Sequence, residues 1–172
     1  MRKTSETDAY WRAFTAATGM DATTDYDVVA FGDSPALADE LLALVLAGTK
    51  RATASLLRDV TVGNEPMPRV GGHVIVLDGT GLPRCIWRTT DVTVNRLIAV
   101  DAAFAWDEGE GDRTRADWLD GHRRYFGRQA EREGFMFDDD IQTVFERFTI
   151  VWPLDVADSV PGRPVPSAGG CN

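Results

Sequence analysis

Apolar residues recur at helical spacing in several parts of the chain, and residues that favour helix termini stand beside them. Gly19 is placed to end the first such run. Ser34 suits the N-cap of the second run, with Pro35 at its first helical position, and Thr114 suits the N-cap of the longest. The expected helices cover residues 5–18, 35–47, 101–107 and 115 to about 132.

Between these helices, runs rich in Val, Ile, Trp and Thr predict strands. Gly79-Thr80-Gly81 marks a hairpin turn, and residues 62–72, with two prolines, are typical of a loop. Helices at the start, in one long crossover and near the end of these strands indicate an α+β fold built on a small curled sheet or barrel. The expected strands cover residues 26–31, 51–57, 73–78, 83–90, 91–98 and 143–152.

The chain has the length and composition of one globular domain. Its 172 residues can bury a core without help from disulfides or metals, and 44% hydrophobic and 26% charged residues are ordinary for a globular chain. We expect a helical extension over residues 1–25 and the main domain over 26–153. Residues 154–172 hold Pro, Gly and Ser without periodicity, which predicts a flexible tail.

Charge and targeting signals narrow the function classes. The net charge of -9 would repel a polyanion at long range, which argues against a general nucleic-acid coat protein but leaves a mononucleotide ligand open. The longest apolar run, residues 41–47, is far shorter than the roughly 20 residues of a membrane helix. No apolar signal segment follows Met1. We therefore expect a cytoplasmic protein with no membrane partner.

The sequence predicts neither a cofactor nor a metal site. Cys85 and Cys171 show no pattern for a disulfide or a zinc site. The acidic loop with Glu108, Glu110 and Asp112 contains no histidine, and such loops are more often solvated than metal-bound. Its carboxylates would also repel a phosphate, so its glycines do not form a phosphate-binding loop.

Lys50, Thr53 and Glu108 supply the groups of a hydrolytic site: an amine, a hydroxyl and a carboxylate. Lys50 and Thr53 follow a predicted helix and Glu108 stands in a glycine-broken loop, and loops on a rigid scaffold often carry chemistry. By spacing alone, Lys50 is more simply a cation near the C-terminus of a helix. Thr53 alone is more often an ordinary strand residue.

Large aromatic residues are a second candidate feature. Trp87, Trp106 and Trp118 could stack on a base, although aromatic residues at such spacings usually belong to the core. We expect His122 to pack or hydrogen-bond beside Trp118 on their shared helix.

Several short motifs together resemble the ASCH family, and the resemblance covers roughly residues 28–152. The combination is specific although each motif alone is weak. It implies a PUA-like small β-barrel with flanking helices, in agreement with the fold class that the pattern predicts. The motifs are Phe31-Gly32-Asp33-Ser34-Pro35, the run from Leu41 to Lys50, Thr53-Ala54-Ser55, Val76-Leu77-Asp78-Gly79, Glu108-Gly109-Glu110-Gly111-Asp112, and Trp118 to His122 with Tyr125-Phe126.

The resemblance also implies functions for this chain. ASCH domains are regarded as RNA-interacting modules, some small members are amidohydrolases of N4-acylated cytidine, and some are described as ribonucleases. The amidohydrolases use a lysine, a threonine three residues later and a glutamate before the last strands. Lys50 and Thr53 match by spacing, and Glu108 is our choice for the glutamate, with Glu110 as its rival. This chain is longer than those enzymes and its acidic loop belongs to a different branch.

Our leading hypothesis is a small cytosolic hydrolase of a modified pyrimidine nucleoside or related amide. Thr53 would be the nucleophile, Lys50 its base or electrostatic partner, and Glu108 would orient Lys50 or handle the leaving amine. Burial lowers a lysine pKa and a carboxylate raises it, so the charge of Lys50 stays open.

Asp33, Arg51, Ser55 and Glu110 are the expected substrate-binding residues. The alternative function is an RNA- or nucleotide-binding module without catalysis, with Lys50 and Arg51 on phosphate, or a ribonuclease. The expected partner is a small nucleoside or nucleotide, or RNA, and the sequence leaves the oligomeric state open.

Overall fold

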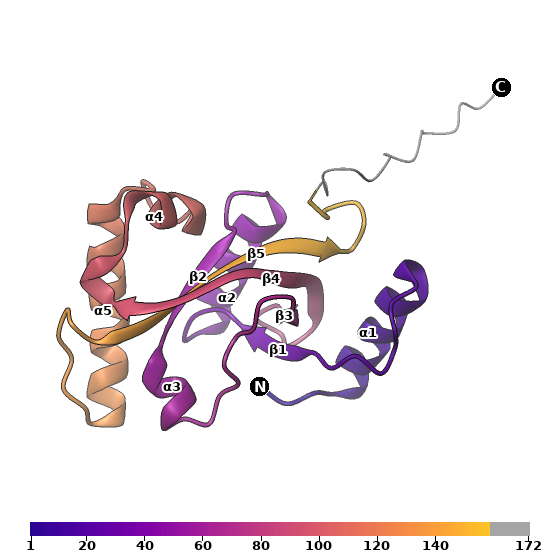
Figure 1. The fold of residues 1–172 in the computed structure, drawn as a ribbon, viewed down its shortest axis with the longest axis horizontal. Coiled ribbons are helices and arrows are strands. Elements are labelled where there is room, and N and C mark those ends of the chain that lie inside the picture. Colours follow the sequence, from indigo (N-terminus) through magenta and orange to yellow (C-terminus); the bar gives the residue numbers. More distant parts are fainter. Residues whose placement is uncertain (159–172) are drawn as a thin grey trace.

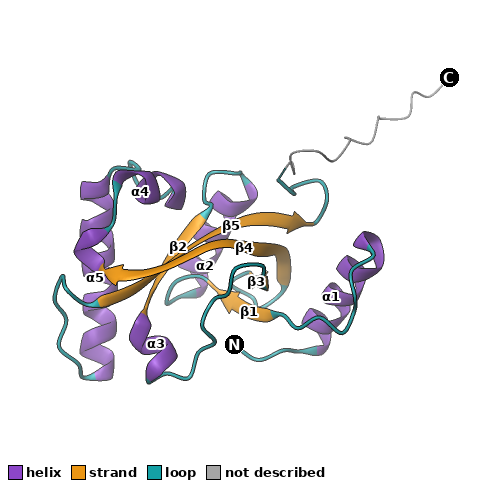
Figure 2. Ribbon diagram, viewed as in Figure 1, coloured by secondary structure: helices purple, strands orange, loops and turns teal. Residues whose placement is uncertain are grey.

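The computed structural model describes residues 1–158, which form a curled sheet with helices packed around it (Figure 1). Figure 2 distinguishes the helices, the strands and the loops by colour. The α+β fold with a barrel-like sheet, expected from the sequence, is confirmed. The helices are α1 (Ser5–Thr18), α2 (Pro35–Leu46), α3 (Leu57–Thr61), α4 (Ala102–Glu108) and α5 (Arg115–Glu133), with a 3-10 turn at Leu97–Ala99.

The sheet is mixed and has the strand order β1-β3-β4-β5-β2. β1 pairs with β3 in parallel, and the other neighbours are antiparallel. β1 and β2 are therefore the two edges, and the open side of the half-barrel lies between them. The strands are β1 (Asp27–Ala30), β2 (Ala52–Leu56), β3 (His73–Leu77), β4 (Pro83–Arg96) and β5 (Gln142–Trp152).

The helix termini follow the predicted chemistry. The side chains of Ser34 and Thr114 accept backbone N–H groups of the first turns of α2 and α5, satisfying donors that a helix start leaves unpaired. Gly19 ends α1 in the left-handed conformation, as expected. Gly48, just after α2, also has a positive φ, of 84°, and this sharp turn sends the chain from the helix into β2.

Three apolar clusters attach the helices to the sheet. Leu42 and Val45 of α2 pack on the middle strands beside Trp87. At one end of the sheet in Figure 1, α4 and α5 pack on β2 and β5, with Trp118 buried between them. At the opposite end, α1 places Trp11 against β1, β3 and β4.

The structure differs from the predicted elements in three places. The expected strands 83–90 and 91–98 are one long strand, because β4 continues through a register irregularity between Thr89 and Asp91. The short helix α3 was not predicted. The predicted tail is described only as far as Asp158, whose carboxylate accepts from Arg51 and from the Ile150 N–H, so residues 154–158 fold back on β5. Residues 159–172 lie outside the described part of the chain.

Candidate functional site

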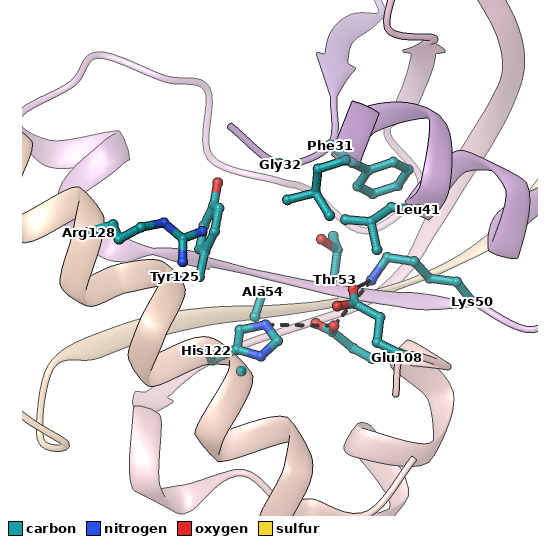
Figure 3. A pocket seen from close by; sticks show the side chains of 13 residues that line it. Phe31, Gly32, Leu41, Lys50, Thr53, Ala54, Glu108, His122, Tyr125 and Arg128 are labelled. Carbon is teal, nitrogen blue, oxygen red and sulfur yellow. Dashed lines mark hydrogen bonds and ion pairs between the residues drawn. The ribbon is translucent and has the colours of Figure 1, made fainter. Parts of the chain in front are cut away.

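A pocket of about 210 Å³ opens between α2, α5 and the edge strand β2 (Figure 3). Lys50 and Glu108 form one wall and His122 and Tyr125 of α5 form the facing wall, while Thr53 of β2 lies between them. The remaining lining residues are Phe31, Gly32, Leu37, Leu41, Ala54, Glu110, Gly121 and Arg128.

Lys50 is a fully buried cation held by the carboxyl groups of two glutamates. Its side chain is 1% exposed, and its Nζ donates to Glu108 Oε2 at 3.1 Å and to Glu110 Oε1 at 2.6 Å. The turn after α2 fixes its backbone, because the Lys50 N–H donates to the Leu44 carbonyl at 3.1 Å. The sequence prediction that these three residues belong to one site therefore agrees with where the fold places them.

Gly109 allows the two carboxylates to approach Lys50. It ends α4 with a φ of 70°, and a Cβ there would lie 2.4 Å from the backbone oxygen of Thr49. Only glycine fits this left-handed conformation at such a close approach. The glycine-broken loop noted in the sequence thus brings both Glu108 and Glu110 within hydrogen-bonding distance of the ammonium.

Burial and mutual charge decide the protonation of this cluster. Burial lowers the pKa of Lys50, but the neighbouring Glu108 and Glu110 outweigh it, so the pKa lies above its usual value and Lys50 is a cation. Burial raises the pKa of Glu108 to about 8, so this carboxyl keeps its proton at neutral pH. Burial also acts on Glu110, but Lys50 outweighs it and the pKa of Glu110 is lowered.

His122 lies beside this cluster and is neutral. Its ring stacks on Trp118 with the ring centroids 3.7 Å apart, and its Nδ1 lies 3.0 Å from the Trp118 carbonyl oxygen. Burial lowers the pKa of His122 to about 4. Nε2 lies 3.7 Å from Glu108 Oε2, too far for a hydrogen bond. The expectation that His122 packs beside Trp118 is confirmed, and the same ring also faces the pocket.

Thr53 stands on the pocket wall near the start of β2. It is partly exposed, and its hydroxyl has no hydrogen-bond partner among residues 1–158. Its register partner on β5 is Glu146. A hydroxyl that faces a pocket without a partner is available to a ligand.

Arginine and tyrosine side chains complete the outer part of the site. The guanidinium of Arg128 lies 5.7 Å from the ring centre of Tyr125 and donates to Asp33 Oδ2 at 3.3 Å. Arg132 donates to the same oxygen at 3.4 Å. Asp33, expected to bind substrate, is therefore occupied by two arginines at the rim.

The other predicted substrate-binding residues are divided by the fold. Glu110 belongs to the pocket through Lys50. Ser55 and Asp33 line a neighbouring pocket of about 520 Å³ that shares Thr53 with the first. Arg51 lines neither pocket, because its guanidinium turns away to Asp158 and to the Val45 carbonyl. The structure thus places Arg51 outside the site.

The tryptophans do not supply a stacking surface in the first pocket. Trp87 and Trp118 are buried, as expected of core residues. Trp106 is 57% exposed on α4, where the Arg113 guanidinium lies 3.9 Å from its ring centre. Phe31 and Tyr125 are the aromatic rings that line the pocket.

Sequence reasoning did not select Tyr125, Arg128 and Glu146 as site residues. Tyr125 and Arg128 follow His122 at three-residue steps, which places all three on one helix face. Glu146 occurs in β5 in phase with the buried Val144 and Phe148. The sequence signal for Glu146 is an acidic residue at a strand position where the alternating pattern predicts a buried side chain.

No group of three or more His, Cys, Asp or Glu side chains within residues 1–158 has the arrangement of a metal site. At the site itself, the ammonium of Lys50 occupies the position between the two carboxylates. In the same described range, no helix is long and apolar enough to cross a membrane.

Comparisons with known proteins agree with this fold. The ASCH domain from Lactobacillus crispatus JV V101 is 29% identical, with a TM-score of 0.76, and the match covers 83% of this chain and 92% of that one. A protein from Enterococcus faecalis V583 is 32% identical, with a TM-score of 0.77, over 84% of this chain and 86% of that one. None of the curated proteins that were compared matched. The family model of the ASCH domain matches residues 27–152, so this chain belongs to the ASCH domain family.

Proposed function

We propose that this protein hydrolyses the amide bond of a small, uncharged substrate, an N4-acylated cytidine or a related amide. The observation that carries the proposal is the free hydroxyl of Thr53 in the wall of a pocket that also contains the buried cluster of Lys50, Glu108 and Glu110. The resemblance to amidohydrolase members of the family supports the same assignment of a lysine, a threonine and a glutamate.

The charge of the pocket favours an uncharged substrate. Its two cations, Lys50 and Arg128, already lie beside carboxylates, so neither is available to neutralise a phosphate without losing a partner. The volume of about 210 Å³ is below the roughly 300–1,000 Å³ of pockets that hold drug-sized ligands. A single nucleoside-sized group suits such a pocket better than a polymer.

The chemistry assigns one role to each group. The Thr53 hydroxyl oxygen adds to the amide carbonyl carbon, and its proton passes to the ionised form of Glu108, whose pKa of about 8 suits proton transfer near neutral pH. The Lys50 ammonium stabilises the negative charge on the carbonyl oxygen. Glu108 then gives the proton to the leaving amine as the C–N bond breaks, and water hydrolyses the threonine ester.

In this scheme Lys50 is the electrostatic partner of the reaction. The sequence left two roles open for Lys50, that of a base and that of an electrostatic partner. A lysine with a raised pKa is a poor base for a threonine hydroxyl, but it is an effective cation. Glu110, whose pKa is lowered, stays ionised and keeps Lys50 charged and in place.

The decisive experiment compares Thr53→Val with Thr53→Ser. Both variants keep a small side chain on β2, but only Thr53→Ser keeps a hydroxyl. We expect the wild-type protein and Thr53→Ser to deacylate N4-acylated cytidines and Thr53→Val to lose at least a hundredfold in kcat/KM, within the roughly 10²–10⁴-fold contribution of a positioned catalytic group. Full activity in folded Thr53→Val would remove Thr53 from the role of nucleophile.

Nucleotide or RNA binding without catalysis is the second candidate. ASCH domains are in general RNA-binding-like, and Tyr125 with the Arg128 guanidinium near its ring offers a surface on which a base could stack. Short RNAs therefore belong in the same assay, where cleavage would indicate a ribonuclease. Binding of RNA should weaken steeply with salt, whereas turnover of an uncharged nucleoside should change little.

A further inference from the structure

The second pocket, of about 520 Å³, joins the first at Thr53. It lies on the open side of the sheet, where both edge strands β1 and β2 line it. Phe31, Gly32, Ala54 and Tyr125 line both pockets together with Thr53. A group bonded to the Thr53 oxygen can therefore extend into the second pocket while the rest of a substrate occupies the first.

Glu146 brings a buried carboxylate to the second pocket. Its side chain is 5% exposed, and Oε1 accepts from the Trp87 Nε1 at 3.2 Å and from the Thr89 hydroxyl at 2.5 Å. Oε2 has no hydrogen-bond partner among residues 1–158, and no ion pair in this range includes Glu146. Burial raises the pKa of Glu146 and outweighs the hydrogen bonds from Thr89 and Trp87, which lower it. A ligand ammonium beside this buried carboxyl group would stabilise its ionised form, so the group marks a place where a ligand cation would be held.

The position of Glu146 relates it to the proposed nucleophile. Glu146 on β5 is the register partner of Thr53 on β2. Register partners on antiparallel strands project from the same face with their Cβ atoms about 4.5–5.5 Å apart. The carboxylate then leans away from Thr53 toward Trp87 and Thr89 on β4, so it lies beyond Thr53 in the second pocket.

The other residues that line the second pocket suit a ligand with an apolar stem and a positively charged end. Val28, Trp87 and Phe126 give this pocket apolar surface, and Trp87 contacts Glu146. One arginine, Arg132, lines this pocket. Its guanidinium lies 3.4 Å from Asp33 Oδ2, so Arg132 pairs with Asp33 and not with Glu146.

We propose that the second pocket binds an acyl group that carries an ammonium, with Glu146 as the carboxylate that receives it. This proposal rests on the proposed amide hydrolysis at Thr53 and narrows the substrate to amides of amino-bearing acids. The bond that breaks is unchanged: the amine leaves from the first pocket, and the aminoacyl group stays on Thr53 in the second until water releases it.

The test compares substrates that differ only in the charged end. N4-(5-aminopentanoyl)cytidine is matched in shape by N4-hexanoylcytidine, and N4-(3-aminopropanoyl)cytidine by N4-butanoylcytidine. We expect the wild-type protein to prefer one or both amino-bearing amides by at least tenfold in kcat/KM. Equal rates within both pairs would overturn the proposal.

Glu146→Gln is the matching variant, because its side-chain oxygen can still accept from Trp87 and Thr89 while the charge is removed. We expect it to retain turnover of the alkyl amides and to lose the preference for the ammonium to within twofold. Glu65→Gln, an exposed carboxylate of the same pocket, is the control and should keep the preference. An unchanged preference in folded Glu146→Gln would overturn the role of Glu146.

A binding measurement separates this proposal from the proposed function. Isothermal titration with 5-aminopentanamide and with hexanamide requires no turnover. If none of the cytidine amides is hydrolysed, the hydrolase proposal fails, but Glu146-dependent binding of 5-aminopentanamide would still identify an ammonium site. Equal binding of the two amides, or equal binding by Glu146→Gln, would refute that site.

Discussion

Replacing Lys50 tests whether the cluster has the charges that we infer. Lys50→Met keeps the length and apolar stem of the side chain but leaves Glu108 and Glu110 without their cation. Removing one partner of a buried ion pair costs about 3–5 kcal/mol, because the remaining charge stays buried. For a chain of this size that corresponds to a fall in Tm of roughly 6–20 °C.

Glu108→Gln is the informative comparison. A carboxyl that already holds its proton is nearly isosteric with a carboxamide, so we expect this variant to lose less than about 1 kcal/mol, the net value of an ordinary hydrogen bond. The assay is urea unfolding of both variants at pH 7, followed by circular dichroism with the wild type alongside. If Glu108→Gln costs as much as Lys50→Met, Glu108 is ionised in the folded protein and our assignment of the proton is wrong.

Two further predictions concern the same loop. The pKa of Glu108 is about 8 in the folded protein, against an ordinary value of 4.5. Between these two pH values Glu108 is protonated in the folded state and ionised in the unfolded state. This group therefore makes the free energy of unfolding fall as pH rises from 4.5 to about 8. Glu108→Gln should therefore flatten the decline in urea midpoint between pH 5 and 8, and an unchanged decline would count against the raised pKa. Gly109→Ala should lose about 3 kcal/mol and most activity, since its Cβ would meet the Thr49 backbone oxygen. Gly134→Ala has a similar φ but open space and should lose only about 1–2 kcal/mol, and equal losses in thermal unfolding would contradict the close-approach argument.

The local elements could be predicted because their causes are local. Ser34 and Thr114 cap the helices that follow them, and helical spacing of apolar residues sets which faces are buried. One exception was β4, where a register irregularity lets one strand continue through Thr89 and Asp91 although the pattern suggested a break. Such an irregularity depends on pairing with β5, which the residues of β4 alone do not specify.

The site could be predicted only in part. Lys50 and Thr53 are close in sequence, and the fold places both in the lining of one pocket. Arg51 was expected in the site for the same reason, but its guanidinium turns to Asp158, a residue distant in sequence. Glu146 was not selected because its proposed role depends on its burial without an ion-pair partner among residues 1–158, which is a property of the packed interior.

The sequence by itself determined most of the helices and strands, the α+β class and the presence of an amine, a hydroxyl and carboxylates. Only the tertiary structure decided that Glu108 and Glu110, 58 and 60 residues beyond Lys50, meet its ammonium in a buried pocket. The protonation of these groups also follows from the fold, because a pKa depends on burial and on neighbouring charges. Both are set by segments that contact one another only when the sheet has closed around them.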